Sequence, residues 1–436
     1  MHDVIETIRN RAEADKDAIL GSLREYIRRA RDGEDAVKDL FARTAEALGC
    51  TVSLHDYSPA DVELIEEFAG EIAIDPQPRH SVVAHLKGTG GGRSLILFAH
   101  PDNEPIPAET GWKHDPFAGE IVDERMHGWG IADDLSGIAA GLQAIELLRS
   151  LGLQPAGDIH IANTPSKRHA RGVHRLLQEG LTADAAVYLH PAESGVGMKE
   201  VKAFTSGEVD FRIVIQGKQP PTTEPLQTAF AHQGINAIDK AYVIWDALKK
   251  LDAERAERVK HPALDAQVGR STNLMMSYIE AGNPKRLSRI AETCTLGAAL
   301  AFPPHEKLSS VCAEIEAAVG EAAEADEWLR NNPPKIIWDA GTTGAEVARD
   351  HPLVEAAFAA VAGVSGGEPL VNPMHTGSDI RVPNVQKGIP TIGLGPLCGD
   401  LTQNGSRDEW VDAEDHVRFV AAIAGIIANW CGTSAK

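Results

Sequence analysis

Short apolar runs and helical periodicities alternate along most of the chain. The runs that predict strands lie at residues 80–88, 94–99, 158–163 and 185–190. Between them, apolar residues recur at intervals of three and four, which predicts helices over 134–149 and 173–180. A further helix is expected over residues 2–31. Strands that alternate with helices are typical of an α/β fold with a mostly parallel sheet.

The periodicity changes near residue 206. Polar and apolar residues alternate in "GEVDFRIVIQG", as in a half-buried strand, and a long helical pattern follows. The next expected elements are strands at 272–282 and 291–302 and a helix at 306–325. After residue 326 the α/β pattern returns. The expected domains are a catalytic α/β domain in two parts, 1–205 and 327–436, and an inserted α+β lid or dimerisation domain, 206–326.

Composition and charge exclude several classes of function. With 43% hydrophobic and 24% charged residues, a chain of 436 residues has enough apolar side chains for roughly two or three structural units. The formal net charge of −21 would repel a phosphate backbone, so we expect no nucleic-acid partner. No window of about 18 consecutive apolar residues occurs, so we expect no membrane partner.

Cysteine usage and the N-terminal segment indicate the compartment. The N-terminal segment lacks the apolar core of a signal peptide. The cysteines are scattered and form no CxxC pair; they are Cys50, Cys294, Cys312, Cys398 and Cys431. We therefore expect a cytoplasmic protein with free thiols and without a cysteine-ligated zinc site.

Polar residues stand at the ends of the predicted strands. His100 ends an apolar run, with Asp102 two residues later, and His190 ends another such run. Asp133 and Asp134 stand together where a helix begins. Each feature has a structural alternative, because a loop histidine can be capped and an aspartate can cap a helix. Strand ends of α/β sheets are also where these folds bind ligands.

Together these residues favour a metal site. The ends of neighbouring parallel strands meet at one edge of a sheet, which would bring His100, Asp133 and His190 together. Zinc and manganese accept two imidazoles and a carboxylate, with water completing the shell. Asp102 could hold the other ring nitrogen of His100, as ligating histidines require.

Longer motifs resemble the dinuclear-zinc exopeptidase and deacylase family. They are "LILFAHPDNEP", "GWKHDPFAGEIVDERMHGWGIADDLSGIAAGLQAI" and "GIP…GLGP…EWV". The family includes glutamate carboxypeptidase, succinyl-diaminopimelate desuccinylase, tripeptidase T and aminoacylase. The resemblance implies that His100, Asp133 and His190 are metal ligands, with Asp133 in the bridging position. It also implies that Asp102 orients His100, that Asp134 is structural, and that the lid pairs subunits in a homodimer or larger homo-oligomer.

The chain departs from the family at three motifs. In "TPSKRHARG", Lys167 and Arg168 replace the family's catalytic glutamate and a glutamate ligand. In "NGSRDEWV", Asn404 or Gly405 stands in place of a histidine ligand. In "GKQPP", Pro221 replaces a histidine that reaches the partner's site in the family.

The losses fall on one of the two metal positions. In the family that the chain resembles, a glutamate and a histidine bind only the second metal, and both are missing here. The positions of His100, Asp133 and His190 are intact. We therefore expect one divalent metal ion, zinc or manganese. Lys167 or Arg168 would supply positive charge near the vacated position and contact the substrate.

The missing glutamate leaves the general base open. Glu193 and Asp379 are candidate catalytic groups. His375 is a third candidate and is also expected to contact the substrate. Arg381, in a family-like "SD-x-R" stretch, could pair with a substrate carboxylate or form a surface salt bridge.

These observations predict a metal-dependent hydrolase. We expect it to cleave a C–N bond in a small carboxylate-bearing substrate by attack of metal-bound hydroxide, and not to act as an ordinary peptidase. One alternative is an arylamine aminohydrolase that displaces ammonia from an activated ring such as 5-nitroanthranilate, a reaction known in the family. Another is a non-catalytic binding protein on a decayed peptidase fold.

Overall fold

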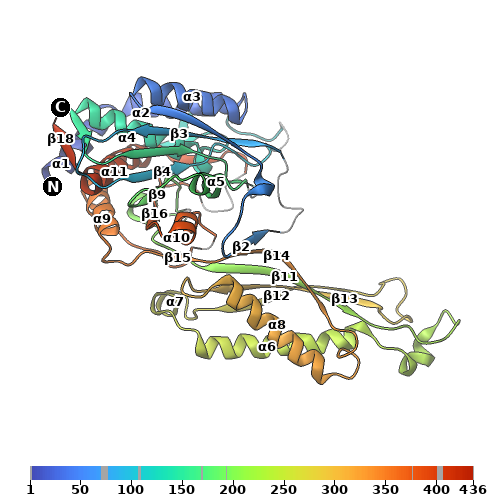
Figure 1. Cartoon of the computed structure of the whole chain (residues 1–436). Helices are drawn as coiled ribbons and strands as arrows, with labels where there is room; N and C mark the ends of the chain where they lie inside the picture. Colours follow the sequence, from blue (N-terminus) through green and yellow to red (C-terminus); the bar gives the residue numbers. More distant parts are fainter. Residues whose placement is uncertain are drawn as a thin grey trace.

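The structure is a computed structural model that describes residues 2–69, 77–106, 110–167, 170–192, 194–375, 377–399 and 406–435. The chain forms two bodies, a larger one that contains both termini and a smaller, elongated one beneath it (Figure 1). Each body has a hydrophobic core of its own. None of the helices within the described ranges is long and apolar enough to cross a bilayer.

A six-stranded sheet runs through the larger body, in the order β1-β3-β8-β4-β9-β16. Its strands are β1 (Thr51–Tyr57), β3 (Arg79–Leu86), β8 (Ile159–Asn163), β4 (Leu95–Ala99), β9 (Ala186–Tyr188) and β16 (Thr391–Gly393). Strands β8, β4, β9 and β16 are mutually parallel, and β1 and β3 pair antiparallel at one edge. The expected mostly parallel α/β sheet is therefore confirmed.

Both faces of this sheet are covered, which explains its continuous apolar strands. In β4, Leu95 and Leu97 belong to the core on one face, and Ile96 and Phe98 to the core on the other. On the first face lie α1 (His2–Ala14), α2 (Lys16–Ala30), α3 (Glu34–Ala47), α4 (Ser136–Ser150), α9 (Pro352–Ser365) and α11 (Ala413–Cys431). On the second lie α5 (Gly172–Gln178) and α10 (Arg381–Lys387). The helix expected over 2–31 is thus two helices, α1 and α2, which meet at Asp15.

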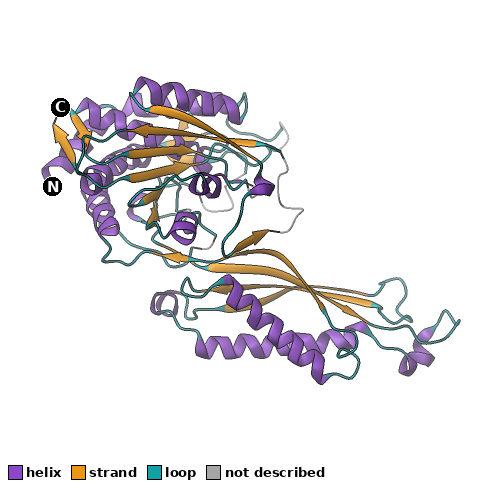
Figure 2. Cartoon of the chain, in the orientation of Figure 1, coloured by secondary structure: helices purple, strands orange, loops and turns teal. Residues whose placement is uncertain are grey.

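The smaller body is an antiparallel sheet covered on one face by helices (Figure 2). Its strand order is β12-β13-β11-β14-β2. The strands are β12 (Asn273–Ala281), β13 (Thr293–Phe302), β11 (Gly207–Gln216), β14 (Lys335–Thr342) and β2 (Glu67–Ala69). Its helices are α6 (Ala237–Arg258), α7 (Pro262–Gln267) and α8 (Leu308–Ala325). In β11, alternate residues are buried, as the sequence pattern predicts.

The domain boundary expected at residue 326 is too early. Strand β14 pairs along β11, so the inserted unit continues to residue 342. Strand β2, from the first part of the chain, adds to the same sheet beside β14. The expectation failed because β14 follows a helix, as a strand of the α/β body would, and only pairing partners distinguish the two.

Short strands complete the fold. A ribbon of β10 (Phe204–Thr205) and β15 (Ala345–Glu346) lies where the chain passes between the bodies (Figure 1). Strands β17 (Trp410–Asp412), β6 (Arg125–His127) and β5 (Ile121–Val122) form a three-stranded sheet. Strands β18 (Thr433–Ala435) and β7 (Leu153–Pro155) pair near the C-terminus.

Candidate active site

Two histidines extend from neighbouring strands of the central sheet. His100 follows β4 and His190 lies just after β9, and these strands run parallel side by side. The two imidazole rings are therefore on the same edge, with their centres 5.9 Å apart. Asp133 comes from the turn that precedes α4. The strand-end placement expected from the sequence holds for both histidines.

The three side chains converge on one buried point. His100 Nε2 lies 2.8 Å and His190 Nε2 3.1 Å from the same oxygen, Oδ1 of Asp133. One ligating atom from each residue lies within 4.8 Å of the others. All three residues are buried. Among the described residues, this is the group that could hold a metal ion.

The donor set fits a divalent cation. His100 donates its Nδ1 hydrogen to the carbonyl of Asp102 over 3.1 Å, so its Nε2 lone pair points at the carboxylate of Asp133. Two acceptors at that distance need a proton or a cation between them. Burial by itself would lower the pKa of His100, but the charge of Asp133 raises it to about 9. Burial likewise opposes ionisation of Asp133, yet the two histidines hold its pKa well below the usual range. A site with this preference for bound positive charge suits zinc or manganese.

Asp102 orients His100, but through its backbone. The carbonyl oxygen accepts from His100 Nδ1, whereas Oδ1 lies 3.5 Å from that nitrogen. The carboxylate instead accepts the backbone N–H groups of Ser166 (2.9 Å) and Lys167 (2.8 Å). Asp102 therefore fixes the loop after β8 as well as the imidazole, and the contact with the imidazole is made by its carbonyl.

Lys167 reaches the second oxygen of the central aspartate. Its Nζ donates to Asp133 Oδ2, on the side away from the two histidines. The side chain is one-quarter exposed, so it also borders open space. The sequence analysis expects Lys167 or Arg168 to supply positive charge near the vacated second-metal position; Lys167 lies beside Asp133, and Arg168 lies outside the described residues.

Glu409 is a site residue that the sequence analysis missed. It is 1% exposed and accepts the backbone N–H groups of Gly130, Ala132 and Asp133. Burial and the charge of Asp133 raise the pKa of Glu409 to about 8. Glu409 thus holds the turn that presents Asp133. Its only sequence signal is its place in the "EWV" motif.

Two further buried polar residues support the site. Asp134 is fully buried and accepts the backbone N–H of His100 over 3.4 Å, as expected of a structural residue, and burial raises its pKa well above the usual range. Lys202 was not foreseen, because no motif marks it. Its Nζ lies 3.1 Å from His190 Nδ1 and donates to the carbonyl of Pro191.

Arg381 pairs with two carboxylates, those of Asp379 and Glu67. Arg381 donates to Asp379 Oδ1 over 2.9 Å and contacts Glu67 Oε1 at 3.1 Å. Ser166 Oγ donates to the other oxygen of Asp379, and His174 Nε2 lies 3.1 Å from Glu67 Oε2. Arg381 is thus neutralised by two carboxylates of its own chain, which disagrees with a role in binding a substrate carboxylate. Both oxygens of Asp379 have partners, which argues against a role as the base.

His375 is bound to Glu200. Its Nε2 contacts Glu200 Oε1, and Ser194 Oγ donates to Oε2 of the same fully buried carboxylate. This arrangement ties the segment after β9 to the segment before α10, and it does not direct His375 to the triad. Of the other sequence candidates, Glu193, Arg168, Asn404 and Gly405 lie outside the described residues.

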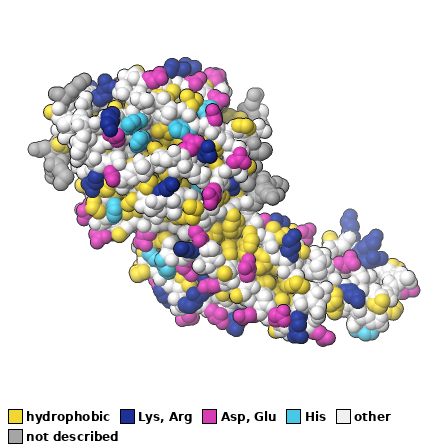
Figure 3. Space-filling view, in the orientation of Figure 1, with side chains coloured by type: hydrophobic (Ala, Val, Ile, Leu, Met, Phe, Trp, Pro, Cys, Tyr) yellow, Lys and Arg dark blue, Asp and Glu magenta, His cyan; other side chains and the backbone are white. Residues whose placement is uncertain are grey.

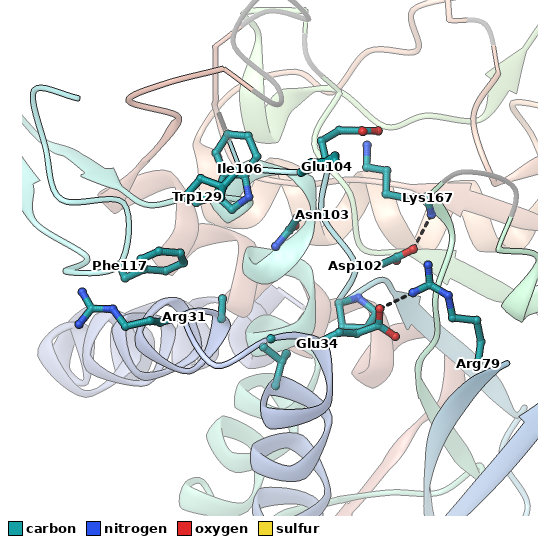
Figure 4. Close-up of a pocket in the computed structure, with 15 residues that line it drawn as sticks. Arg31, Glu34, Arg79, Asp102, Asn103, Glu104, Ile106, Phe117, Trp129 and Lys167 are labelled. Atoms are coloured by element: carbon teal, nitrogen blue, oxygen red, sulfur yellow. Dashed lines mark hydrogen bonds and ion pairs between the residues drawn. The ribbon is translucent and has the colours of Figure 1, made fainter. Parts of the chain in front are cut away.

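A cavity of about 340 Å³ lies beside Lys167. Its wall combines the loop after β4, helices α2 and α3, and apolar side chains that include Ile106, Phe117 and Trp129. In Figure 4, Glu104 lies near Lys167 at one end, and Arg31 lies beside Phe117 at the other. Asp102 and Lys167 belong both to this wall and to the network around the triad.

Solved structures with this architecture include metallopeptidases. An aminopeptidase PepT from Bacillus cereus aligns with a TM-score of 0.66 and 18% identity, covering 95% of this chain and 99% of the other. A dinuclear metal-binding peptidase of the M20 family from Bacillus subtilis aligns with a TM-score of 0.59 and 16% identity over 96% and 99% of the two chains. At these identities the likeness shows the fold.

Sequence relatives extend over most of the chain. An N-formyl-4-amino-5-aminomethyl-2-methylpyrimidine deformylase from Halalkalibacterium halodurans is 26% identical over 422 residues, 92% of this chain and 90% of the relative. A succinyl-diaminopimelate desuccinylase from Rhodopseudomonas palustris is 25% identical over 354 residues, 78% and 84% of the two chains. The sequence model of peptidase family M20/M25/M40 matches residues 96–429. This match confirms the resemblance seen in the motifs, and the chain belongs to peptidase family M20/M25/M40, a family of hydrolases.

Proposed function

We propose that this protein hydrolyses an amide C–N bond in a small, non-peptide substrate with one divalent metal ion, zinc or manganese. The observation that carries the proposal is the convergence of His100, Asp133 and His190 on one buried point. A divalent cation there would supply Lewis acidity and lower the pKa of a coordinated water.

The residues around the triad have distinct roles in this proposal. His100 and His190 would hold the cation through Nε2, and the carbonyl of Asp102 fixes the ring of His100. Glu409 holds the backbone of Asp133. Such outer contacts set ligand orientation and metal affinity. Since Arg381, Asp379 and His375 are bound within the chain, Glu193 remains the proposed base on sequence grounds.

The count of one metal is supported by the partners of Asp133. A solved structure with the same fold, from Bacillus subtilis, is that of a dinuclear metal-binding peptidase. In this chain, Asp133 Oδ1 faces the two histidines, and Oδ2 is bound by Lys167. Two replaced ligand positions in the sequence and a lysine on Oδ2 both favour a single ion.

The cavity and the relatives support a small amide substrate. A volume of about 340 Å³ is at the lower end for small-molecule sites. Two relatives are deformylases of an aminomethylpyrimidine, and another is a desuccinylase. They favour release of an acyl group over displacement of ammonia from a ring. The buried triad favours an enzyme over a decayed binding protein.

The test combines metal loading with a substrate panel. We expect about one zinc or manganese per chain by elemental analysis, lost in His100→Ala and retained in His232→Ala, which changes an exposed histidine of the smaller body. The loaded protein should hydrolyse N-formyl or N-acyl amines, and neither dipeptides nor nitroanthranilate. About two metals per chain, or none, would contradict the proposal of a single metal ion. Release of ammonia from nitroanthranilate would instead support the aminohydrolase.

We also propose a cytoplasmic homodimer or larger homo-oligomer. The five cysteines, all in the described part of the chain, are free thiols, as a reducing compartment requires. The antiparallel sheet of the smaller body has an open groove of about 620 Å³ on its surface. Met275, Tyr278 and Ala298 form part of its wall. Hydrophobic side chains gather on the smaller body next to the junction in Figure 3. Exposed apolar patches of this kind mark association surfaces.

A further inference from the structure

The two oxygens of Asp133 have different partners. Oδ1 lies 2.8 Å from His100 Nε2 and 3.1 Å from His190 Nε2. Oδ2 accepts from Nζ of Lys167. A single buried carboxylate therefore connects the metal position on one side to an ammonium group on the other.

Lys167 is held in this position by its own backbone. Its N–H donates to Asp102 Oδ2 over 2.8 Å, and the neighbouring Ser166 N–H donates to Asp102 Oδ1 over 2.9 Å. Asp102 in turn accepts from His100. The loop that carries the lysine and the imidazole that binds metal are thus fixed by the same residue.

The ammonium group is also accessible to a substrate. The side chain of Lys167 is 25% exposed, whereas that of Asp133 is 7% exposed. Lys167 lines the cavity of about 340 Å³ (Figure 4). An ammonium has three N–H donors. One of them is used by Asp133, which leaves two that can point towards the nearby Glu104 or towards a molecule in the cavity.

We propose that Lys167 is a built-in second cation of the active site: its ammonium takes the place of a second metal on Asp133 Oδ2 and donates to the oxygen of the scissile group. This inference rests on the proposed single-metal hydrolase. It assigns to Lys167 the second positive charge that a site with one metal ion lacks. An ammonium differs from a metal ion because it cannot be removed by a chelator. It also repels the bound ion and competes for the charge of Asp133.

This arrangement predicts opposite effects on two ligands. Without the ammonium, Asp133 gives its full charge to the metal position, so the metal should bind more tightly. An anion in the cavity would lose a charged donor and should bind more weakly. A lysine that only stabilises the loop would not produce this pair of changes.

The experiment uses Lys167→Met in the full-length chain, with Lys113→Met as the control, because Lys113 is exposed. Zinc alone is titrated first, and sulfate, a tetrahedral dianion, is then titrated into the zinc-loaded protein. For Lys167→Met we expect the zinc Kd to fall about tenfold or more. We expect the sulfate Kd to rise about tenfold. Lys113→Met should leave both values unchanged.

A charge-conserving variant separates electrostatics from folding. Lys167→Arg retains the positive charge, so its zinc Kd should stay within about threefold of the parent value. Circular dichroism of each variant shows whether it has folded. If Lys167→Met misfolds, Lys167→Gln provides the same neutral comparison.

The outcomes distinguish this inference from the proposed function. If the parent protein binds one zinc and Lys167→Met leaves both Kd values unchanged, the role of Lys167 is overturned and the metallohydrolase stands. Weaker zinc binding in Lys167→Met would also overturn it, because the lysine would then support the site and not oppose the ion. A parent protein that binds no zinc would overturn both.

Discussion

At the residue scale, the site depends on how backbone groups hold a few side chains. His100 is fixed by the carbonyl of Asp102, and Asp133 by three N–H groups that converge on Glu409. The spacing of two residues predicts that Asp102 holds His100, but not that its backbone carbonyl makes the contact. The contact of Glu409 with the Asp133 turn and that of Arg381 with Glu67 cannot be read from spacing, because the partners are more than 270 positions apart along the chain.

Glu409 offers a test at this scale. Glu409→Ala would leave three buried N–H groups of the Asp133 turn without their acceptor, so the carboxylate would lose its fixed direction. We expect zinc affinity to fall about 10- to 100-fold, as for other outer contacts of metal sites. Glu409→Gln keeps one oxygen acceptor and should lose less. Isothermal titration with zinc measures both.

The control for this test is Glu414→Ala, which removes a half-exposed glutamate that pairs with Lys16. It should bind zinc as the parent does. Unchanged zinc affinity in a folded Glu409→Ala would show that the turn holds Asp133 without Glu409.

At the scale of elements, helix α11 contains a buried histidine in an apolar environment. His416 is fully buried in it, and neither ring nitrogen has a hydrogen-bond partner among the described residues. Burial lowers the pKa of His416 to about 3. The helix therefore keeps a neutral imidazole in an apolar layer, where protonation would be strongly unfavourable.

This burial predicts acid sensitivity of α11. Between pH 3 and about 6.5 the unfolded chain binds a proton at His416 that the folded chain does not, so stability rises with pH and is lost as the pH falls. From pH 7 to 5 the loss from this residue is about 2 kcal/mol. In His416→Leu, the opening free energy of α11 amides, measured by hydrogen exchange, should fall less over this interval.

An exposed histidine provides the comparison. His232→Leu should show the same pH dependence as the parent. Parallel curves for the parent and His416→Leu would mean that His416 is already protonated in the folded chain or gains a partner there.

At the scale of the whole molecule, two bodies share strands and a junction. Strand β2 comes from the first part of the chain and pairs with β14 in the sheet of the smaller body, and the ribbon of β10 and β15 lies between the bodies. Glu67 of β2 contacts Arg381 at the start of α10. The junction thus includes a buried ion pair that connects a strand of the smaller body's sheet to helix α10.

The proposed subunit interface can be tested by substitutions on the sheet of the smaller body. Met275 and Tyr278 are about half exposed on β12, at 59% and 48%. A double substitution to aspartate would place two charges in an apolar contact, so we expect the dimer to dissociate to monomer in light scattering. Leu54→Asp, which alters a 66% exposed leucine on β1, should leave the assembly intact. A dimer that persists in the double variant would place the interface elsewhere.

Much of the fold follows from local patterns. The strands around β4 and β9 and the helices α4 and α5 were expected within a few residues, because a buried strand or an amphipathic helix leaves a periodic pattern in its own sequence. The convergence of His100 and His190 could be predicted for the same reason: both residues follow recognisable strands, and parallel strands present their ends at one edge.

What the sequence by itself determined is the class of fold, the insertion and the three candidate ligands. Tertiary structure alone decided the partners of the charged residues: Lys167 with Asp133, Glu409 with the Asp133 turn, and Arg381 with Glu67. It also placed β14 in the sheet of the smaller body, where it pairs with β11. The physical reason is that periodicity records whether a position is buried, whereas an ion pair or strand pairing depends on which distant segment the folded chain brings alongside.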